Sequence, residues 1–239
     1  NRLRETDAKR YAALVKELQG LEWAPERTAA WLAKLKGWQE EYPLRYEDPA
    51  DGTLAPQFVI EEIDRVTRHQ AVVVTDVGQH QMWATQYYTF TFPRQWISSG
   101  GLGTMGFGLP ASIGAKVGRP DATVIDISGD GGFQMTVQEL ATAVNYDIPV
   151  VVAILDNTYL GMVRQWQDLF WNKRYSQTHF ERQPDFKMLA EAYGAVGMRV
   201  TGKDEVADAL HEAIRCGRPA VIDFKVAAEE NVYPMVPAG

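Results

Sequence analysis

Two short polar strings in the middle of the chain follow apolar runs and carry groups that could bind a metal. Gly129–Gly132, which includes Asp130, comes directly after the β-branched run 124–127, and Asp156-Asn157 follows the apolar run 149–155. Apolar side chains at helical spacing between these strings predict a connecting helix. Strands joined through a helix are parallel neighbours whose carboxyl ends share one edge of a sheet. Asp130 and Asn157 are therefore predicted to lie close together.

This combination of groups suits a metal-bound diphosphate. Mg²⁺ prefers oxygen ligands such as the Asp130 carboxylate and the Asn157 amide oxygen. Glycine N–H groups at the start of a helix bind phosphate oxygens. A Gly-Asp-Gly turn alone is a weak signal, because tight strand-to-helix turns often have this sequence. The interpretation of this string as a turn that binds no ligand therefore stays open.

Composition limits the class of protein. The chain has 239 residues, of which 46% are hydrophobic, enough for one large domain and an appendage. Its net charge of −7 argues against nucleic acid or an anionic membrane as the main partner. Cys216 is the only cysteine, and no apolar run approaches the roughly 20 residues of a spanning helix. We expect a cytoplasmic protein, or an organelle stroma protein in a plastid-bearing organism.

The chain divides into a short helical part and a larger domain. Residues 1–45 carry two apolar stripes at helical spacing, one over 11–18 and one over 31–38 after Pro25. Residues 46–54 contain Pro, Gly and Asp and are typical of a linker. We therefore interpret residues 1–50 as the helical tail of an upstream domain plus linker, and residues 51–239 as the main domain.

The main domain alternates apolar strands with helices. Strands are predicted at 71–74, 124–127, 149–155, 196–200 and 220–226, and helices at 58–66, 106–117, 133–144, 162–170, 186–193 and 206–214. This alternation predicts an α/β fold with a doubly wound, mostly parallel sheet and helices on both faces. Ligands of such folds bind beyond the carboxyl ends of the strands, where Asp76-Val77-Gly78 should also lie.

Several strings occur together in an order that resembles one family. These are VGQHQMWA at 77–84, SGGLGTMGFGLPA at 99–111, the GDG turn with Asn157, and LGMVRQWQ at 160–167 with RYSQTHF downstream. Together they look like the catalytic subunit of the acetohydroxyacid synthase (acetolactate synthase) family. The resemblance covers about residues 55–237 and implies its C-terminal thiamin diphosphate-binding domain.

The resemblance also implies roles for individual residues. Mg²⁺ would be bound by Asp130, Asn157 and the backbone carbonyl of Tyr159. Met105 would hold the cofactor bent and Trp166 would shape the substrate pocket, which makes these two the candidate catalytic residues. The complete implied cofactor-binding set is Val77, Gly78, Gln79, His80, Gly103, Met105, Gly129, Asp130, Gly131, Gly132, Asn157, Tyr159, Gly161 and Met162.

The implied reaction is the decarboxylation of pyruvate and its carboligation to a second 2-keto acid, pyruvate or 2-ketobutyrate, in branched-chain amino acid biosynthesis. The glutamate that activates the cofactor belongs to another domain of the family, so the isolated chain is expected to be inactive. FAD is expected only in the full-length enzyme, with no site in this chain. The resemblance further implies a homo-oligomer, such as a dimer, and a possible small regulatory subunit.

Two positions depart from the family pattern. Asp156 stands where the family has the first of two asparagines, and its added carboxylate could either tighten the metal or repel the diphosphate. Gly132 stands where serine often occurs, which we interpret as added flexibility with the N–H donor kept.

Other interpretations of these residues remain open. His80 could lie on the surface or at a helix start, and Met105 and Trp166 could pack in the core. His179 is interpreted as a structural residue or a loop contact. The chain could also come from a related decarboxylase, oxidase or glyoxylate carboligase, or act as a non-catalytic binding or assembly module.

Overall fold

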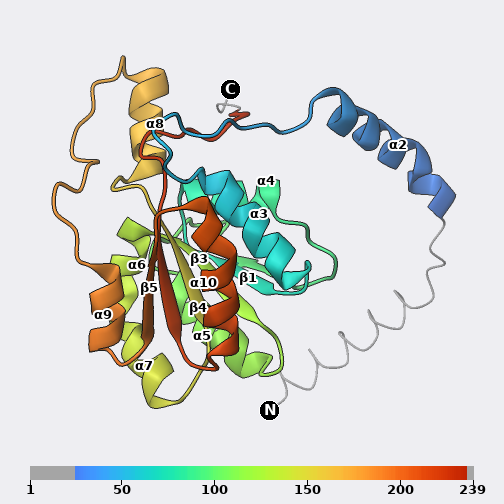
Figure 1. Ribbon diagram of the computed structural model, residues 1–239. Helices are drawn as coiled ribbons and strands as arrows, with labels where there is room; N and C mark the ends of the chain where they lie inside the picture. The colour runs from blue at the N-terminus through green and yellow to red at the C-terminus, as the bar shows by residue number, and fades with distance from the viewer. Residues whose placement is uncertain (1–24, 236–239) are drawn as a thin grey trace, which may run out of the picture. The chain divides into compact units, whose positions relative to one another are not determined.

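The computed structural model describes residues 25–235, and the chain separates after Arg45 into two units (Figure 1). The first unit contains α2 (Pro25–Glu41), which begins at the proline that the sequence indicated. Its large apolar side chains Trp31, Leu32 and Trp38 are exposed. The other predicted stripe, at 11–18, lies outside the described residues. Within residues 25–235, no helix has both the length and the apolar character to cross a membrane.

The second unit is built on a six-stranded, wholly parallel sheet in the order β2-β1-β3-β4-β6-β5. Its strands are β1 (Val72–Thr75), β2 (Trp96–Ser98), β3 (Val124–Gly129), β4 (Val151–Asp156), β5 (Val196–Val200) and β6 (Ala220–Lys225). The predicted doubly wound α/β fold is confirmed. The strand order reverses direction between β1 and β3, and this switch point is where such sheets bind ligands.

Helices cover both faces of the sheet (Figure 1). They are α3 (Pro56–Thr67), α4 (Gln79–Tyr87), α5 (Gly108–Gly118), α6 (Asp130–Thr136), the 3₁₀ turn η1 (Val137–Glu139), α7 (Leu140–Asn145), α9 (Phe186–Ala192) and α10 (Lys203–Arg215). A further helix, α8 (Gly161–Phe170), lies beyond the carboxyl ends of the strands (Figure 1). Alternate residues of β4 face opposite sides, as the pleat requires. Ala153 packs with α3, α4 and α10, while Ile154 packs with α5, α6, α7 and α9.

The structure differs from the predicted elements in three places. The helix predicted at 133–144 is divided into α6, η1 and α7. Its break lies at Thr136, whose hydroxyl donates to the Gly106 carbonyl at 2.9 Å and ties the helix to the glycine-rich loop. The strand β2 and the helix α4 were not predicted. α4 buries Gln79 and His80 beside Trp83, so its sequence shows no apolar periodicity.

Candidate functional site

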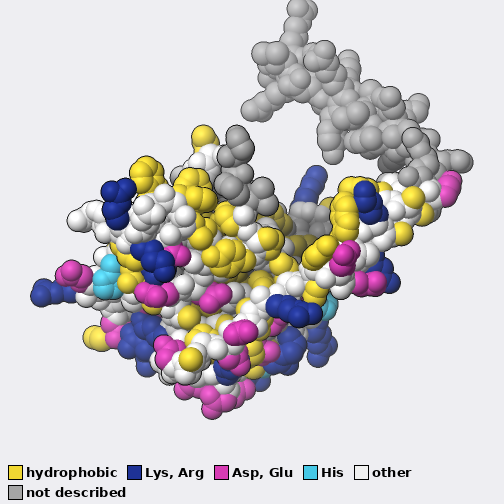
Figure 2. All heavy atoms as spheres, turned by 90° about the horizontal axis from the view of Figure 1, so that it is seen from above, with side chains coloured by type: hydrophobic (Ala, Val, Ile, Leu, Met, Phe, Trp, Pro, Cys, Tyr) yellow, Lys and Arg dark blue, Asp and Glu magenta, His cyan; other side chains and the backbone are white. Residues whose placement is uncertain are grey.

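A pocket opens at the carboxyl ends of β1, β3 and β4, and it encloses about 450 Å³ of space that is partly open to solvent. Seen from above, this end of the molecule shows many hydrophobic side chains among scattered charges (Figure 2). The pocket is lined by Val77, Gly78, Gln79, His80, Trp83, Met105, Gly129, Asp130, Gly131, Gly132, Leu155, Asn157, Tyr159, Leu160, Gly161, Met162 and Val163. All of the predicted cofactor-binding residues except Gly103 are in this set.

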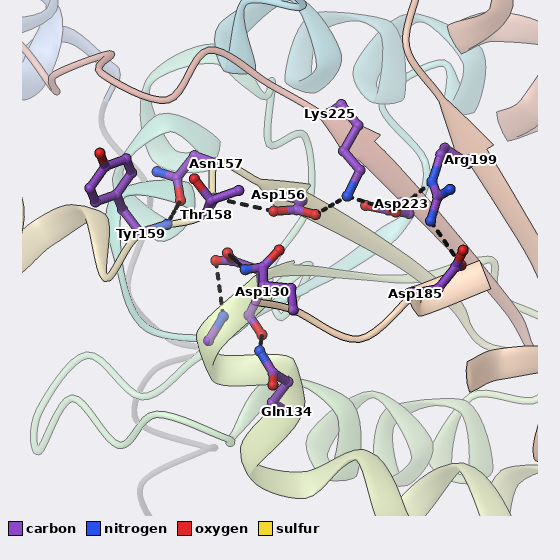
Figure 3. A network of polar contacts seen from close by, with 12 residues as sticks. Asp130, Gln134, Asp156, Asn157, Thr158, Tyr159, Asp185, Arg199, Asp223 and Lys225 are labelled. Atoms are coloured by element: carbon purple, nitrogen blue, oxygen red, sulfur yellow. Dashed lines mark hydrogen bonds and ion pairs between the residues drawn. The ribbon is translucent and has the colours of Figure 1, made fainter. Parts of the chain in front are cut away.

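Asp130 and Asn157 come together because they follow adjacent strands. Gly129, at the end of β3, is in register with Leu155 of β4. Asp130 is 1% exposed and accepts a hydrogen bond from the Gly131 N–H at 2.9 Å. The Asn157 side-chain oxygen accepts the Tyr159 N–H at 3.0 Å (Figure 3). Both side chains line the same pocket, which confirms their predicted proximity.

This set of oxygens differs from an acidic metal cluster. Among residues 25–235 no group of three or more His, Cys, Asp or Glu side chains could hold a metal ion. The predicted Mg²⁺ ligands are instead one carboxylate, one amide and one backbone carbonyl. That number is normal for Mg²⁺ when phosphate oxygens and water complete the octahedron.

The Asp130 carboxyl has a pKa far from that of an ordinary aspartate. Burial raises its pKa to about 8, and the negative charge of Asp156 acts in the same direction. The side chain of Gln183 donates a hydrogen bond to its second oxygen. A divalent cation would supply the missing positive charge. Gln183 was not predicted, because it lies in the irregular segment before α9 where no sequence pattern marks it.

His80 is buried at the start of α4, with 7% of its surface exposed. The helix-start interpretation is therefore confirmed and the surface interpretation is wrong. Its Nε2 has no hydrogen-bond partner within the described part of the chain. A side chain at Gly78 or Gly129 would collide with the ring, because a Cβ there would lie 2.7 and 2.9 Å from its atoms. A buried ring nitrogen without a partner can receive a ligand oxygen.

Burial also lowers the pKa of His80 to about 4, against an opposing effect of Asp76. The unfolded chain takes up this proton near pH 6.5, so stability is lost as the pH falls toward 4. Between pH 7 and pH 5 the loss from His80 should be about 2 kcal/mol. We expect the difference in unfolding free energy between wild type and His80→Gln to change by this amount. Urea unfolding at both pH values measures it, and the opposite contribution of Asp130 cancels between the two proteins.

Glycines in the pocket allow side chains to approach the backbone closely. A Cβ on Gly132 would lie 2.1 Å from the Asp76 carboxylate, and one on Gly161 would lie 2.0 Å from the Gln79 side-chain oxygen. Asp76 accepts the N–H of Gly108 at 2.9 Å, so its position is fixed. Gly132 is therefore required for space, and the interpretation as added flexibility is replaced by this packing reason.

Two predicted residues lie outside the pocket. Gly103 is exposed with a φ of +67° in the glycine-rich loop. Trp166 is 52% exposed on α8, so its interpretation as a core residue is wrong. It borders a neighbouring hollow with Trp171 and Arg174, and Val163 lines both this hollow and the pocket. Met105, in contrast, is half-buried in the pocket wall.

The helix α8 buries polar side chains and exposes apolar ones. Gln165 is fully buried and accepts from Gln79 and from the Val232 N–H, both at 2.8 Å. Arg164 is 5% exposed and lies over the ring of Tyr159. Sequence reasoning missed both residues because they face away from the apolar stripe. His179 stacks on Tyr159 with ring centroids 4.6 Å apart, which confirms it as a loop contact.

The sequence from the exit of β1 to β6 is shared with a known family. Residues 76–224 match the model described as "Thiamine pyrophosphate enzyme, C-terminal TPP binding domain". This stretch includes both polar strings and every residue that lines the pocket. The chain belongs to the thiamine pyrophosphate enzyme family. Thiamine pyrophosphate is the thiamin diphosphate that the sequence resemblance implied.

Within the thiamine pyrophosphate enzymes, the chain is similar to acetolactate synthases. It is 51% identical over 214 residues to "Acetolactate synthase" of Mycobacterium leprae, covering 87% of this chain and 34% of that protein. It is 47% identical over 208 residues to "Acetolactate synthase isozyme 3 large subunit" of Escherichia coli, covering 86% and 36%. It is 46% identical over 213 residues to "Acetolactate synthase, mitochondrial" of Schizosaccharomyces pombe, covering 87% and 32%. The chain thus spans about a third of the length of these relatives.

Proposed function

We propose that the chain is the diphosphate- and metal-binding part of an acetolactate synthase, a transferase that uses thiamin diphosphate and Mg²⁺. The observation that carries the proposal is the meeting of Asp130, Asn157 and His80, whose Nε2 has no hydrogen-bond partner among residues 25–235, in one pocket at the switch point of the sheet. The names of the relatives support the choice of reaction. It would decarboxylate pyruvate and join the product to pyruvate or 2-ketobutyrate, in branched-chain amino acid biosynthesis.

The residues of the pocket have distinct roles in this proposal. Asp130, Asn157 and the Tyr159 carbonyl would hold Mg²⁺, which would supply positive charge next to the diphosphate. The backbone N–H groups of Gly131 and Gly132 at the start of α6, the Gln79 side chain and the Nε2 of His80 would contact the diphosphate itself. Bound thiamin diphosphate supplies the electron sink for decarboxylation.

The remaining groups would orient the cofactor and the substrate. Met105 in the pocket wall would support the cofactor in its bent form, and Gly103 would offer its carbonyl to the pyrimidine. Trp166, beside the hollow next to the pocket, would select the second keto acid. The apolar side chains that α8 exposes are typical of a surface that binds another protein chain, so we propose a homo-oligomer. We further propose that FAD and a small regulatory subunit bind elsewhere in the full-length enzyme.

The full-length protein should form acetolactate from pyruvate when Mg²⁺ and thiamin diphosphate are present. The 239-residue chain alone should form little, because the family resemblance assigns the activating glutamate to another domain. Product analysis by colour reaction and by mass spectrometry measures both. Acetolactate formed at the full rate by the isolated chain would contradict this division of roles.

The same assay separates the alternative functions. Acetaldehyde without acetolactate from the full-length protein would favour a related decarboxylase. The absence of any keto-acid turnover, with cofactor binding intact, would favour a non-catalytic binding module.

A further inference from the structure

Asp156 and Lys225 form an ion pair directly beside the proposed metal site. They are register partners at the carboxyl ends of the adjacent strands β4 and β6. One carboxylate oxygen of Asp156 accepts from the Lys225 ammonium group, and the other accepts the Thr158 N–H at 3.1 Å (Figure 3). Asp156 is 1% exposed and immediately precedes the predicted ligand Asn157.

Lys225 is itself held in place by a chain of charges that leads away from the pocket. Its ammonium group lies 3.0 Å from the Asp223 carboxylate, which also accepts from Arg199 at 3.1 Å. Arg199 in turn lies 2.8 Å from Asp185, whose side chain caps α9. These contacts fix the Lys225 side chain at the end of β6. Its ammonium group therefore holds the Asp156 carboxylate on the β6 side of β4 (Figure 3).

The turn after Asp156 depends on the same carboxylate. Thr158 has a φ of +63°, in the left-handed region that a β-branched residue rarely adopts. The hydrogen bond from its N–H to Asp156 supports this conformation. The turn places Asn157 and Tyr159, two of the three predicted Mg²⁺ ligands, on either side of Thr158. A displaced Asp156 would therefore disturb both the charge and the shape of the site.

We propose that Lys225 is a positioning residue that pairs with Asp156 and holds its carboxylate toward β6, so that less of the negative charge of Asp156 acts on Asp130, the metal and the diphosphate. The inference rests on the proposed function. The ion pair with Lys225 would offset part of the negative charge of Asp156, which on its own would attract the metal and repel the diphosphate.

The test compares wild type, Lys225→Met, Lys225→Arg and the double variant Asp156→Asn/Lys225→Met in the full-length protein. Binding of Mn²⁺ alone is followed by electron paramagnetic resonance, and binding of thiamin diphosphate at saturating Mg²⁺ by calorimetry. In Lys225→Met the Asp156 carboxylate loses its counter-ion. Its negative charge should then tighten the binding of Mn²⁺ and weaken the binding of thiamin diphosphate, each by about tenfold. Lys225→Arg and the double variant should both return to within about threefold of wild type.

The opposite signs of the two effects distinguish positioning from a merely structural role. Weaker binding of both ligands in Lys225→Met without rescue in the double variant would overturn the inference, and so would unchanged binding of both. In either case thiamin diphosphate binding by the wild type would leave the proposed function standing. A wild type that binds no thiamin diphosphate would remove the proposed function and the inference together. Urea unfolding of each variant confirms that folded proteins are compared.

Discussion

Replacing Asp130 by asparagine is expected to weaken Mg²⁺-dependent binding of thiamin diphosphate by about 100-fold or more, because the metal loses its only carboxylate ligand. The fold should survive the change. Burial raises the pKa of the Asp130 carboxyl to about 8, so an uncharged amide of nearly the same shape suits this buried position. Calorimetry with and without Mg²⁺ measures the effect.

A matched control is available at the other end of β3. Asp121 is exposed and lies before the strand, beside Pro120 and Ala122 in a separate surface hollow. Asp121→Asn should bind thiamin diphosphate as the wild type does. Equal binding by Asp130→Asn and wild type would show that the metal is held elsewhere.

Replacing Gly132 by alanine is expected to destabilise the protein by about 1–3 kcal/mol, although alanine favours helices. A Cβ at this position would lie 2.1 Å from the Asp76 Oδ1 and 2.7 Å from its carboxyl carbon. Asp76 cannot turn aside without breaking its hydrogen bonds to the N–H groups of Gly108 and Val77, at 2.9 and 2.7 Å. Since β1 and α6 both border the pocket, cofactor binding should weaken as well.

Gly114 provides the control for this change. It lies in the helix α5, is exposed, and a Cβ there would have no neighbour within 4 Å. Gly114→Ala should therefore stabilise the protein by about 0.5–1 kcal/mol through helix propensity alone. Chemical denaturation of both variants gives the comparison. Equal effects of the two substitutions would mean that α6 moves to make room and that the close packing of Asp76 is not required.

The sheet was predictable because its central strands are short apolar runs bounded by polar or glycine residues. The strand at 124–127 and the strand at 149–155 are found within a few residues of their predicted ends, as β3 (Val124–Gly129) and β4 (Val151–Asp156). Elements that depart from simple patterns were missed. β2 is a half-buried edge strand of three residues, and α4 buries polar side chains, so neither shows the expected periodicity.

The pocket residues that directly follow strands could be predicted from the sequence. The GDG turn and Asn157 are local strings whose meeting follows from parallel strand topology. The partners that tune these groups are not local. Lys225 reaches Asp156 only through the pairing of β4 with β6, and Gln183 reaches Asp130 from an irregular segment. The helix α8 buries the polar Gln165 and exposes the apolar Trp166, which is the opposite of the usual relation between polarity and burial.

The position of the bound metal is the most direct test of the proposed site. Crystals of the full-length protein grown with thiamin diphosphate and Mn²⁺ in place of Mg²⁺ would give an anomalous-scattering peak at the bound ion. We predict one peak in the pocket, in contact with the Asp130 carboxylate, the Asn157 side-chain oxygen and the Tyr159 carbonyl, with the diphosphate completing the shell. A peak away from these three oxygens, or a diphosphate bound outside the pocket, would contradict it.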